Sequence, residues 1–347
     1  MFNFRNDYHD LCHPKVLEAL RATDGENNAG YGFDAHTARA EALIQQAVGG
    51  AYPVHFVAGG TAANVLALTF HLRPHQGVVS ADSGHIVADE VASIEATGHK
   101  VLTVKTDQGK YDPDALDDFL SSFGSFHNVL PGILYLSNAT ETGLVYTKEE
   151  LLAIRKVADA HKLLIYVDGA RMATALTAEA SDVHLSDYPD FADLFSIGGT
   201  KNGALFGEAL VFKNASLAEE FIYFQKQRGM LLAKGFTLGA QFEALFTDDL
   251  FFENGRIANE AARYLARELR WIGVTFAYPP ESNQLFLRLS KTVAEALKAY
   301  GQFEVMSEGD PLTVRFVTDY NTTKEEIDEA VARLDGLLKE GVPGKSE

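Results

Sequence analysis

Short apolar segments alternate with helical patterns through most of the chain, and this alternation restricts the possible folds more than any other feature. Two segments, 61–72 and 148–162, have apolar residues at helical spacing. Strands buried on both faces appear as continuous apolar runs, and helices between them form the crossovers of a parallel sheet. The sequence therefore predicts an α/β domain with a mostly parallel sheet and helices on both faces, with strands at 53–60, 77–81, 100–105, 132–138, 163–170, 193–199 and 208–213.

The pattern changes beyond residue 240. A long amphipathic helix is predicted at 251–273, shorter strands and helices follow, and a helix at 324–340 ends the pattern. We therefore expect a large α/β domain at 1–245, which includes the N-terminal segment, and a small C-terminal α+β domain at 246–347.

The charge of the chain argues against two classes of partner. Its 48 acidic and 30 basic residues give a formal net charge of −18, which disfavours nucleic acid and anionic membranes. No apolar run reaches the length of about 18 residues that spans a membrane, and the N-terminus does not resemble a signal peptide. The single cysteine, Cys12, excludes an intramolecular disulfide and a thiolate metal site. We expect a cytoplasmic protein without a bound metal.

Several polar residues lie at or just beyond the ends of the predicted strands. Ligands of open α/β sheets bind at the carboxyl ends of the strands, so side chains at these positions are expected to meet. The candidates are Gly59, Gly60, Thr61, His85, Asn138, Asp168, Arg171 and Lys201.

The turn AGGTAAN (58–64) joins a predicted strand to a predicted helix. Glycines at this position expose backbone N–H groups at the helix N-terminus, which binds phosphate. Thr61 can cap the helix and offer its hydroxyl to the same phosphate. A tight turn with a threonine cap explains these residues equally well, and neither a Walker motif nor a dinucleotide-binding glycine pattern is present.

Two charged residues lie in unusually apolar surroundings. Asp168 ends the apolar strand of YVDGAR (166–171), where a carboxylate requires a cation or a donor. Arg171 could be that cation, or Asp168 could keep a ring nitrogen of a ligand protonated. Lys201 lies among the glycines of SIGGTKNGALFGE (196–208), where apolar neighbours would depress its pKa and make its amine a nucleophile. An ordinary loop lysine is the alternative.

Together these parts fit one cofactor, pyridoxal phosphate. It requires a lysine for a Schiff base, a carboxylate for its pyridine nitrogen and a cradle for its phosphate. His85, in SADSGHIVADE (80–90), follows a strand and can stack on the ring. A surface or helix-capping histidine beside Asp82, Ser83 and Asp89 is the other interpretation.

The order and spacing of the motifs resemble the fold-type-I pyridoxal-phosphate enzymes of the threonine aldolase and β-eliminating lyase family, over nearly the whole chain. The most specific motifs are GGTAAN, SGHIVADE, EATGHK, LSNATETG, YVDGAR and GGTKNG, with RND and YGFD near the N-terminus. The resemblance implies an aspartate-aminotransferase-like fold. It also implies a homodimer or homotetramer whose active sites are built across an interface.

The resemblance also implies a role for each candidate residue. Lys201 would hold the cofactor, Asp168 would pair with its pyridine nitrogen, and His85 would stack on its ring. Gly60 and Thr61 would bind its phosphate. Arg171 would lie beside the cofactor and the substrate carboxylate, and the other substrate-binding residues would be Asn6, Thr140, Arg315 and the Tyr31 of a neighbouring subunit.

Three features depart from the family pattern. Asn6 replaces a serine that helps to bind the substrate carboxylate. Thr140 replaces a histidine that contacts the β-hydroxyl in threonine aldolases, and a threonine cannot act as a base at neutral pH, so His85 or a water would take that task. The lysine segment, GGTKNGALFGE, differs from the serine-rich form common in the aldolases.

The implied activity is retro-aldol cleavage of L-threonine or L-allo-threonine to glycine and acetaldehyde. Another β-eliminating lyase would use the same Lys201, Asp168 and His85, and an aminotransferase is a further alternative. A non-catalytic nucleotide-binding module would require only AGGTAAN. Arg315 could instead be a strand-edge arginine paired with Asp319 or a nearby Glu, and Tyr31 a core tyrosine.

Overall fold

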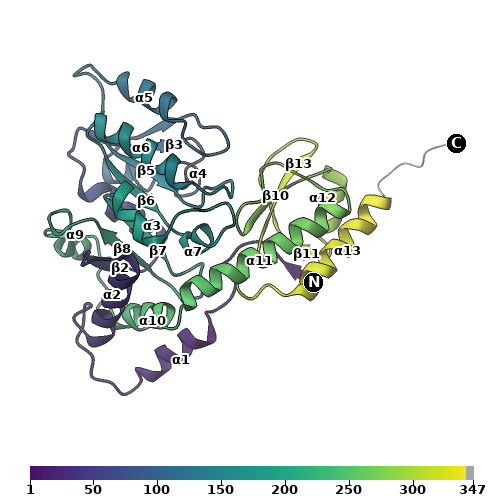
Figure 1. The fold of residues 1–347 in the computed structure, drawn as a ribbon, viewed down its shortest axis with the longest axis horizontal. Coiled ribbons are helices and arrows are strands. Elements are labelled where there is room, and N and C mark those ends of the chain that lie inside the picture. The colour runs from purple at the N-terminus through teal and green to yellow at the C-terminus, as the bar shows by residue number, and fades with distance from the viewer. Residues whose placement is uncertain (341–347) are drawn as a thin grey trace.

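The computed structural model describes residues 1–340 and shows a larger and a smaller part, each built around its own sheet (Figure 1). The long helix α11 (Leu250–Trp271) runs between them. It packs on α7 and α10 in the larger part and on α13 and β10 in the smaller one. Of the helices formed by residues 1–340, none combines the length and the apolar character needed to cross a membrane.

The larger part contains a seven-stranded sheet in the order β2-β8-β7-β6-β5-β3-β4. Strands β3 to β7 are parallel, whereas β8 is antiparallel to both of its neighbours. A short loop joins β7 to β8, and a parallel connection would need a crossover of a dozen or more residues. The mostly parallel sheet is confirmed, with strands β2 (Val54–Val57), β3 (Gln76–Ala81), β4 (Val101–Val104), β5 (Leu130–Ser137), β6 (Leu164–Asp168), β7 (Leu194–Gly198) and β8 (Glu208–Phe212).

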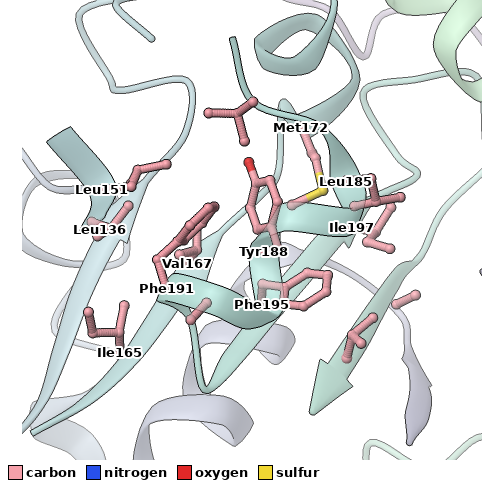
Figure 2. Packing of buried hydrophobic residues seen from close by; sticks show 14 of the residues in the cluster. Leu136, Leu151, Ile165, Val167, Met172, Leu185, Tyr188, Phe191, Phe195 and Ile197 are labelled. Carbon is pink, nitrogen blue, oxygen red and sulfur yellow. The ribbon is translucent and has the colours of Figure 1, made fainter. Parts of the chain in front are cut away.

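Helices cover both faces of this sheet, as the apolar strands predict. Along β6, Ile165 and Val167 enter one hydrophobic cluster while Tyr166 enters the cluster on the opposite face. Figure 2 shows the first cluster, where Tyr188 and Phe195 pack with their ring centroids 5.1 Å apart. Its helices include α1 (Pro14–Ala22), α2 (Ala35–Val48), α5 (Pro113–Ser121), α6 (Lys148–Ala160), α7 (Met172–Leu176), α8 (Tyr188–Phe191) and α10 (Phe236–Phe246), and the opposite face has α3 (Gly60–Phe70), α4 (His85–Ala88) and α9 (Phe221–Gln227).

The smaller part is an antiparallel sheet in the order β12-β13-β10-β9, packed against helices. Strand β1 (Phe2–Asn3) pairs with β11 (Gly301–Gln302), so Phe2 and Phe4 are buried in this second core. The chain therefore starts in the smaller part and then crosses to the larger one. The predicted division at residue 245 stays a prediction. The remaining elements are β9 (Thr275–Phe276), β10 (Gln284–Leu289), β12 (Glu304–Val305), β13 (Leu312–Val317), α12 (Lys291–Leu297) and α13 (Lys324–Glu340).

Candidate active site

One cavity of about 340 Å³ lies at the carboxyl ends of the parallel strands. Because β8 runs in the opposite direction, its first residue, Glu208, reaches the same edge of the sheet as the last residues of β6 and β7. The structure brings most of the predicted residues together there, as expected for an open α/β sheet. Those lining the cavity are Gly59, Gly60, Thr61, His85, Asp168, Arg171 and Lys201, whereas Asn138 does not line it.

Asp168, the last residue of β6, is buried and hydrogen-bonded by neutral donors. Its Oδ2 accepts bonds from Asn64 Nδ2 (3.0 Å) and the Tyr135 hydroxyl (2.9 Å), and its Oδ1 accepts one from the Ala170 N–H (2.9 Å). Within residues 1–340 it forms no ion pair, so the alternative prediction that Arg171 is its partner is wrong. A fixed carboxylate without a cation can stabilise a cationic group of a ligand.

The carboxylate of Asp168 is oriented by a buried polar network. Asn64, on α3, donates from Nδ2 to Asp168 and also to Glu90 Oε1 (2.8 Å). The Tyr166 hydroxyl donates to Asn64 Oδ1 (2.9 Å), which fixes the orientation of the amide. Because each member has a partner, the network holds the Asp168 carboxylate in one position.

Lys201 follows β7 and extends into the cavity among charged groups. Burial lowers the pKa of its ammonium group and the nearby Arg171 guanidinium lowers it further, while Asp7, Asp168 and Glu208 act in the opposite direction without restoring it. The structure of residues 1–340 contains no salt bridge to the Lys201 side chain. A lysine with a lowered pKa has more of the neutral amine that acts as a nucleophile.

The loop around Lys201 depends on a glycine and on Glu208. Gly203 has φ +95°, and a Cβ there would lie 2.8 Å from Asn254 Nδ2, so a side chain would be strained and crowded. Glu208 Oε2 accepts the Gly199 N–H (2.9 Å), which ties β8 to the residues before the lysine. Burial raises the pKa of Glu208 to about 7.

Two arginines from different parts of the molecule lie near each other: Arg171 lines the cavity, whereas Arg315 does not line it but is close enough for its charge to interact with Arg171 and Asp7. Arg171 makes a bidentate contact with Asp7, from Nε to Oδ2 (2.7 Å) and from Nη2 to Oδ1 (3.1 Å). Arg315, on β13, has a buried Nε without a hydrogen-bond partner in the described chain. Asp319 accepts bonds from Thr322 and Glu304 pairs with Arg5, and Arg315 forms no ion pair within residues 1–340, so the alternative pairing of Arg315 with Asp319 or a nearby Glu is wrong. An unpartnered guanidinium beside a second one suits an anionic group such as a carboxylate.

The N-terminus of α3 forms the remaining wall. Gly59 is the N-cap and no side chain caps the helix, so the expected threonine cap at Thr61 is wrong. Added Cβ atoms at Gly59 and Gly60 would meet nothing within 4 Å, which leaves open space in front of the helix end. Uncapped N–H groups and the positive end of the helix dipole favour a phosphate in that space.

His85 and Asn6 lie at the rim of the site. His85 begins α4, and its side chain is 38% exposed with Nδ1 at 3.4 Å from Asp89 Oδ2. Asn6 does not line the cavity, but its Oδ1 accepts the N–H of Tyr8, which does (3.1 Å). Asn6 therefore shapes the turn that leads to Tyr8 in the cavity wall.

Tyr31 and Thr140 lie outside the cavity. Tyr31 is 41% exposed, so it is not a core tyrosine, and it lines a second cavity of about 260 Å³ together with Phe33. Thr140 is buried, and its hydroxyl is bonded to the Thr142 hydroxyl (2.9 Å) and the Leu144 N–H (3.1 Å). Glu141, the next residue, lines the cavity instead.

These features fit pyridoxal phosphate. The uncapped helix end with open space in front of it suits the phosphate. The Asp168 carboxylate, which forms no ion pair within residues 1–340, suits the pyridine nitrogen, and the Lys201 amine suits the aldehyde. Several residues that line the cavity, or that hydrogen-bond to Asp168 or Arg171, were not predicted from the sequence. Most of them lie within the motifs already named: Asp7, Asn64, Tyr135, Glu141 and Glu208.

Comparisons with known proteins agree with this site. A family model described as β-eliminating lyase matches residues 12–292. The low specificity L-threonine aldolase of Pseudomonas aeruginosa is 32% identical over 329 residues, which cover 93% of this chain and 94% of that protein. The aldolase of the same name from Saccharomyces cerevisiae is 28% identical and covers 83% of this chain.

Solved structures agree as well. A threonine aldolase from Leishmania major superimposes with a TM-score of 0.95 at 38% identity, over 97% of this chain and 100% of that one. An aspartate aminotransferase from Thermotoga maritima superimposes with a TM-score of 0.75 at 16% identity, which shows the shared fold. This chain belongs to the β-eliminating lyase family, as the match of the family model and the similarity to the threonine aldolases show, and its Lys201 shares one cavity with an uncapped helix end.

Proposed function

We propose that this protein is a pyridoxal-phosphate-dependent aldolase that cleaves L-threonine and L-allo-threonine to glycine and acetaldehyde. The observation that carries the proposal is one cavity that joins the Lys201 amine, the cation-free Asp168 carboxylate and the uncapped end of α3. The names of the similar aldolases point to the same substrate class.

When bound, pyridoxal phosphate supplies an electron sink for the bond that breaks at the substrate Cα. Lys201 would hold the cofactor through its amine, and Asp168 would hold the proton on the pyridine nitrogen. The N-terminus of α3 would bind the phosphate through Gly60 and Thr61, and His85 would lie against the ring.

Arg171 and Arg315 would bind the substrate carboxylate, Arg171 while it remains paired with Asp7. Because Arg315 comes from the smaller part, substrate binding would connect the two parts of the molecule. Fixing the carboxylate decides which bond at Cα lies in the position to break.

We propose that the protein assembles as a homotetramer built from dimers and acts in the cytoplasm. Tyr31 lies outside the cavity that contains Lys201, and Phe33 beside it is 73% exposed. A role for Tyr31 in catalysis would therefore be at the site of another copy. Sedimentation equilibrium would test the assembly, and a Tyr31→Phe variant with unchanged activity would count against this role.

The test of the activity is an aldehyde assay with L-threonine on protein loaded with pyridoxal phosphate. We expect acetaldehyde and glycine, together with a visible absorbance band that borohydride bleaches as it attaches the cofactor to Lys201. Pyruvate from serine without acetaldehyde would favour β-elimination, and pyridoxamine phosphate would favour transamination. Lys201→Ala should lose the band and the activity, whereas Lys156→Ala, on the exposed face of α6, should keep both.

A further inference from the structure

Retro-aldol cleavage requires a group that accepts the proton of the β-hydroxyl, and the residue expected at that position cannot do so. Thr140 is 1% exposed and its hydroxyl is engaged with Thr142 and Leu144. Its backbone carbonyl accepts a bond from Gln284 Nε2 (3.3 Å), which anchors the residue away from the cavity. The proton acceptor must therefore lie elsewhere.

Glu141, the residue that follows Thr140, lies in the cavity wall. It lines the same cavity as Lys201, on the loop that follows β5. Its Oε1 accepts the His85 backbone N–H (2.9 Å) and the Ser137 hydroxyl (2.6 Å). Both of these bonds end on Oε1, and the structure of residues 1–340 shows no bond from another residue to Oε2. One oxygen therefore fixes the carboxylate while the other remains available to a ligand.

The surroundings of Glu141 suit a general base. Burial raises the pKa of the carboxyl group, and the nearby Asp168 charge adds to the rise, while the bond from the Ser137 hydroxyl and backbone N–H groups oppose it. A carboxylate with a raised pKa is a stronger base, and enzymes tune glutamates in this way. The titratable or charged groups that interact electrostatically with it are Tyr111, Tyr135, Tyr146, Asp168 and Arg171, and His85 contacts it through its backbone N–H.

We propose that Glu141 is the general base of the cleavage, with its Oε2 accepting the proton of the substrate β-hydroxyl. This assignment rests on the proposed aldolase activity. His85 is the competing candidate. Both residues line the cavity, but His85 is half-exposed and its ring nitrogens face Asp89 and Glu90, whereas the Glu141 carboxylate is held by two hydrogen bonds.

The step balances without a further reactant. The O–H bond of the β-hydroxyl breaks, its proton passes to Glu141 Oε2, and its electron pair forms the carbonyl of the aldehyde. The Cα–Cβ bond breaks, and its electron pair stays with the glycine fragment, where the electron sink of a bound cofactor would stabilise it. The glycine fragment gains one proton at Cα and Glu141 returns its proton to water, so no net proton is consumed.

The variant Glu141→Gln separates this role from the rest of the site, since glutamine keeps the shape and an acceptor oxygen but cannot take a proton. Two reactions are compared in the loaded enzyme: cleavage of L-threonine, and exchange of the glycine α-proton with deuterium, followed by NMR. Glycine has no β-hydroxyl, so its exchange does not need the proposed base. We expect cleavage to fall by about 100-fold or more while the exchange rate and the cofactor absorbance band stay within a few-fold of wild type.

Other outcomes overturn the assignment. Cleavage that survives in Glu141→Gln places the base elsewhere, and a matched His85→Asn variant that loses only cleavage would identify it. Loss of cleavage, exchange and the absorbance band together would show that Glu141 holds the site in shape. If the wild-type protein forms no acetaldehyde but exchanges the glycine proton, the proposed aldolase activity itself is wrong. The assignment of Glu141 as its base then falls with it.

Ser137→Ala gives a second readout that does not depend on removing the carboxylate. The Ser137 hydroxyl stabilises the ionised form of Glu141, so its removal should raise the pKa of that group further. The acidic limb of the kcat/KM profile reports the base of the free enzyme, so it should move to higher pH. An unchanged limb in a variant with normal cofactor absorbance would contradict the role of Glu141.

Discussion

Arg171 binds Asp7 through two parallel hydrogen bonds of 2.7 and 3.1 Å, although 164 positions separate them in the chain. Asp7 lies on the segment that crosses from the smaller part, and it also accepts a bond from Asn283 Nδ2 (3.0 Å). Burial acts to raise the pKa of Asp7, but the charges of Arg171 and Lys201 and two hydrogen bonds outweigh it, so the pKa lies below its usual value. The pair joins the N-terminal segment to the active site.

The first prediction concerns this pair. Asp7→Asn leaves the Arg171 guanidinium buried without a counter-charge, and removing one partner of a buried ion pair costs about 3–5 kcal/mol. Chemical denaturation at pH 7 should show this loss, whereas Asp24→Asn, at an exposed position, should show almost none. Because the folded pKa is depressed, the contribution of Asp7 is complete above the ordinary aspartate pKa of about 3.9 and disappears as the pH falls through the folded value. A difference that persists unchanged in acid would contradict the assignment.

The second prediction concerns the Lys201 amine. A lysine of ordinary pKa near 10.4 would capture pyridoxal phosphate faster with each rise in pH up to that value. Burial and the Arg171 charge lower the pKa of Lys201, so the rate of covalent capture by cofactor-free protein should level off at a lower pH. Stopped-flow absorbance across pH 6–11 measures this rate. A rate that still rises at pH 10 would show that the lysine is unperturbed.

The third prediction concerns Glu208. Burial raises the pKa of this carboxyl group to about 7, so ionised Glu208 opposes folding at high pH. The penalty is absent below the ordinary glutamate pKa of about 4.3, grows as the pH rises toward 7, and then stays constant. Glu208→Gln should therefore be more stable than wild type at pH 8 in the cofactor-free protein, and equal to it near pH 4. Equal denaturation midpoints at both pH values would rule out a buried, proton-binding Glu208.

The fourth prediction compares two glycines within helices. Replacing a mid-helix glycine by alanine usually stabilises a protein by up to about 1 kcal/mol. A Cβ at Gly239 in α10 would lie 2.7 Å from the Thr37 Cα of α2, so Gly239→Ala should be destabilising. A Cβ at Gly336 in α13 meets nothing within 4 Å, so Gly336→Ala should be stabilising. Thermal unfolding of both variants checks the opposite signs, and a stabilising Gly239→Ala would show that the two helices can separate at low cost.

Local signals predicted much of the fold. The seven strands of the large sheet and the helices α3, α6, α11 and α13 follow from apolar periodicity, because burial on one or both faces imposes that periodicity on the sequence. The reversal of β8 did not follow. Its apolar run is the same in either direction, and the direction is decided by the length of the loop and by the neighbours in the sheet.

The sequence by itself determined which reactive groups the protein has: an amine in a glycine-lined loop, a carboxylate at a strand end and a glycine turn before a helix. Glycines, strand ends and charged residues next to apolar segments are local features, so they can be recognised in the sequence alone. Only the tertiary structure decided the partners. Arg171 is paired with Asp7 and not with the nearby Asp168, and Glu141 faces the cavity while Thr140 does not. Which residues pair and which side chains face the cavity depends on distances between segments that are far apart in the chain. These distances are fixed only in the folded protein.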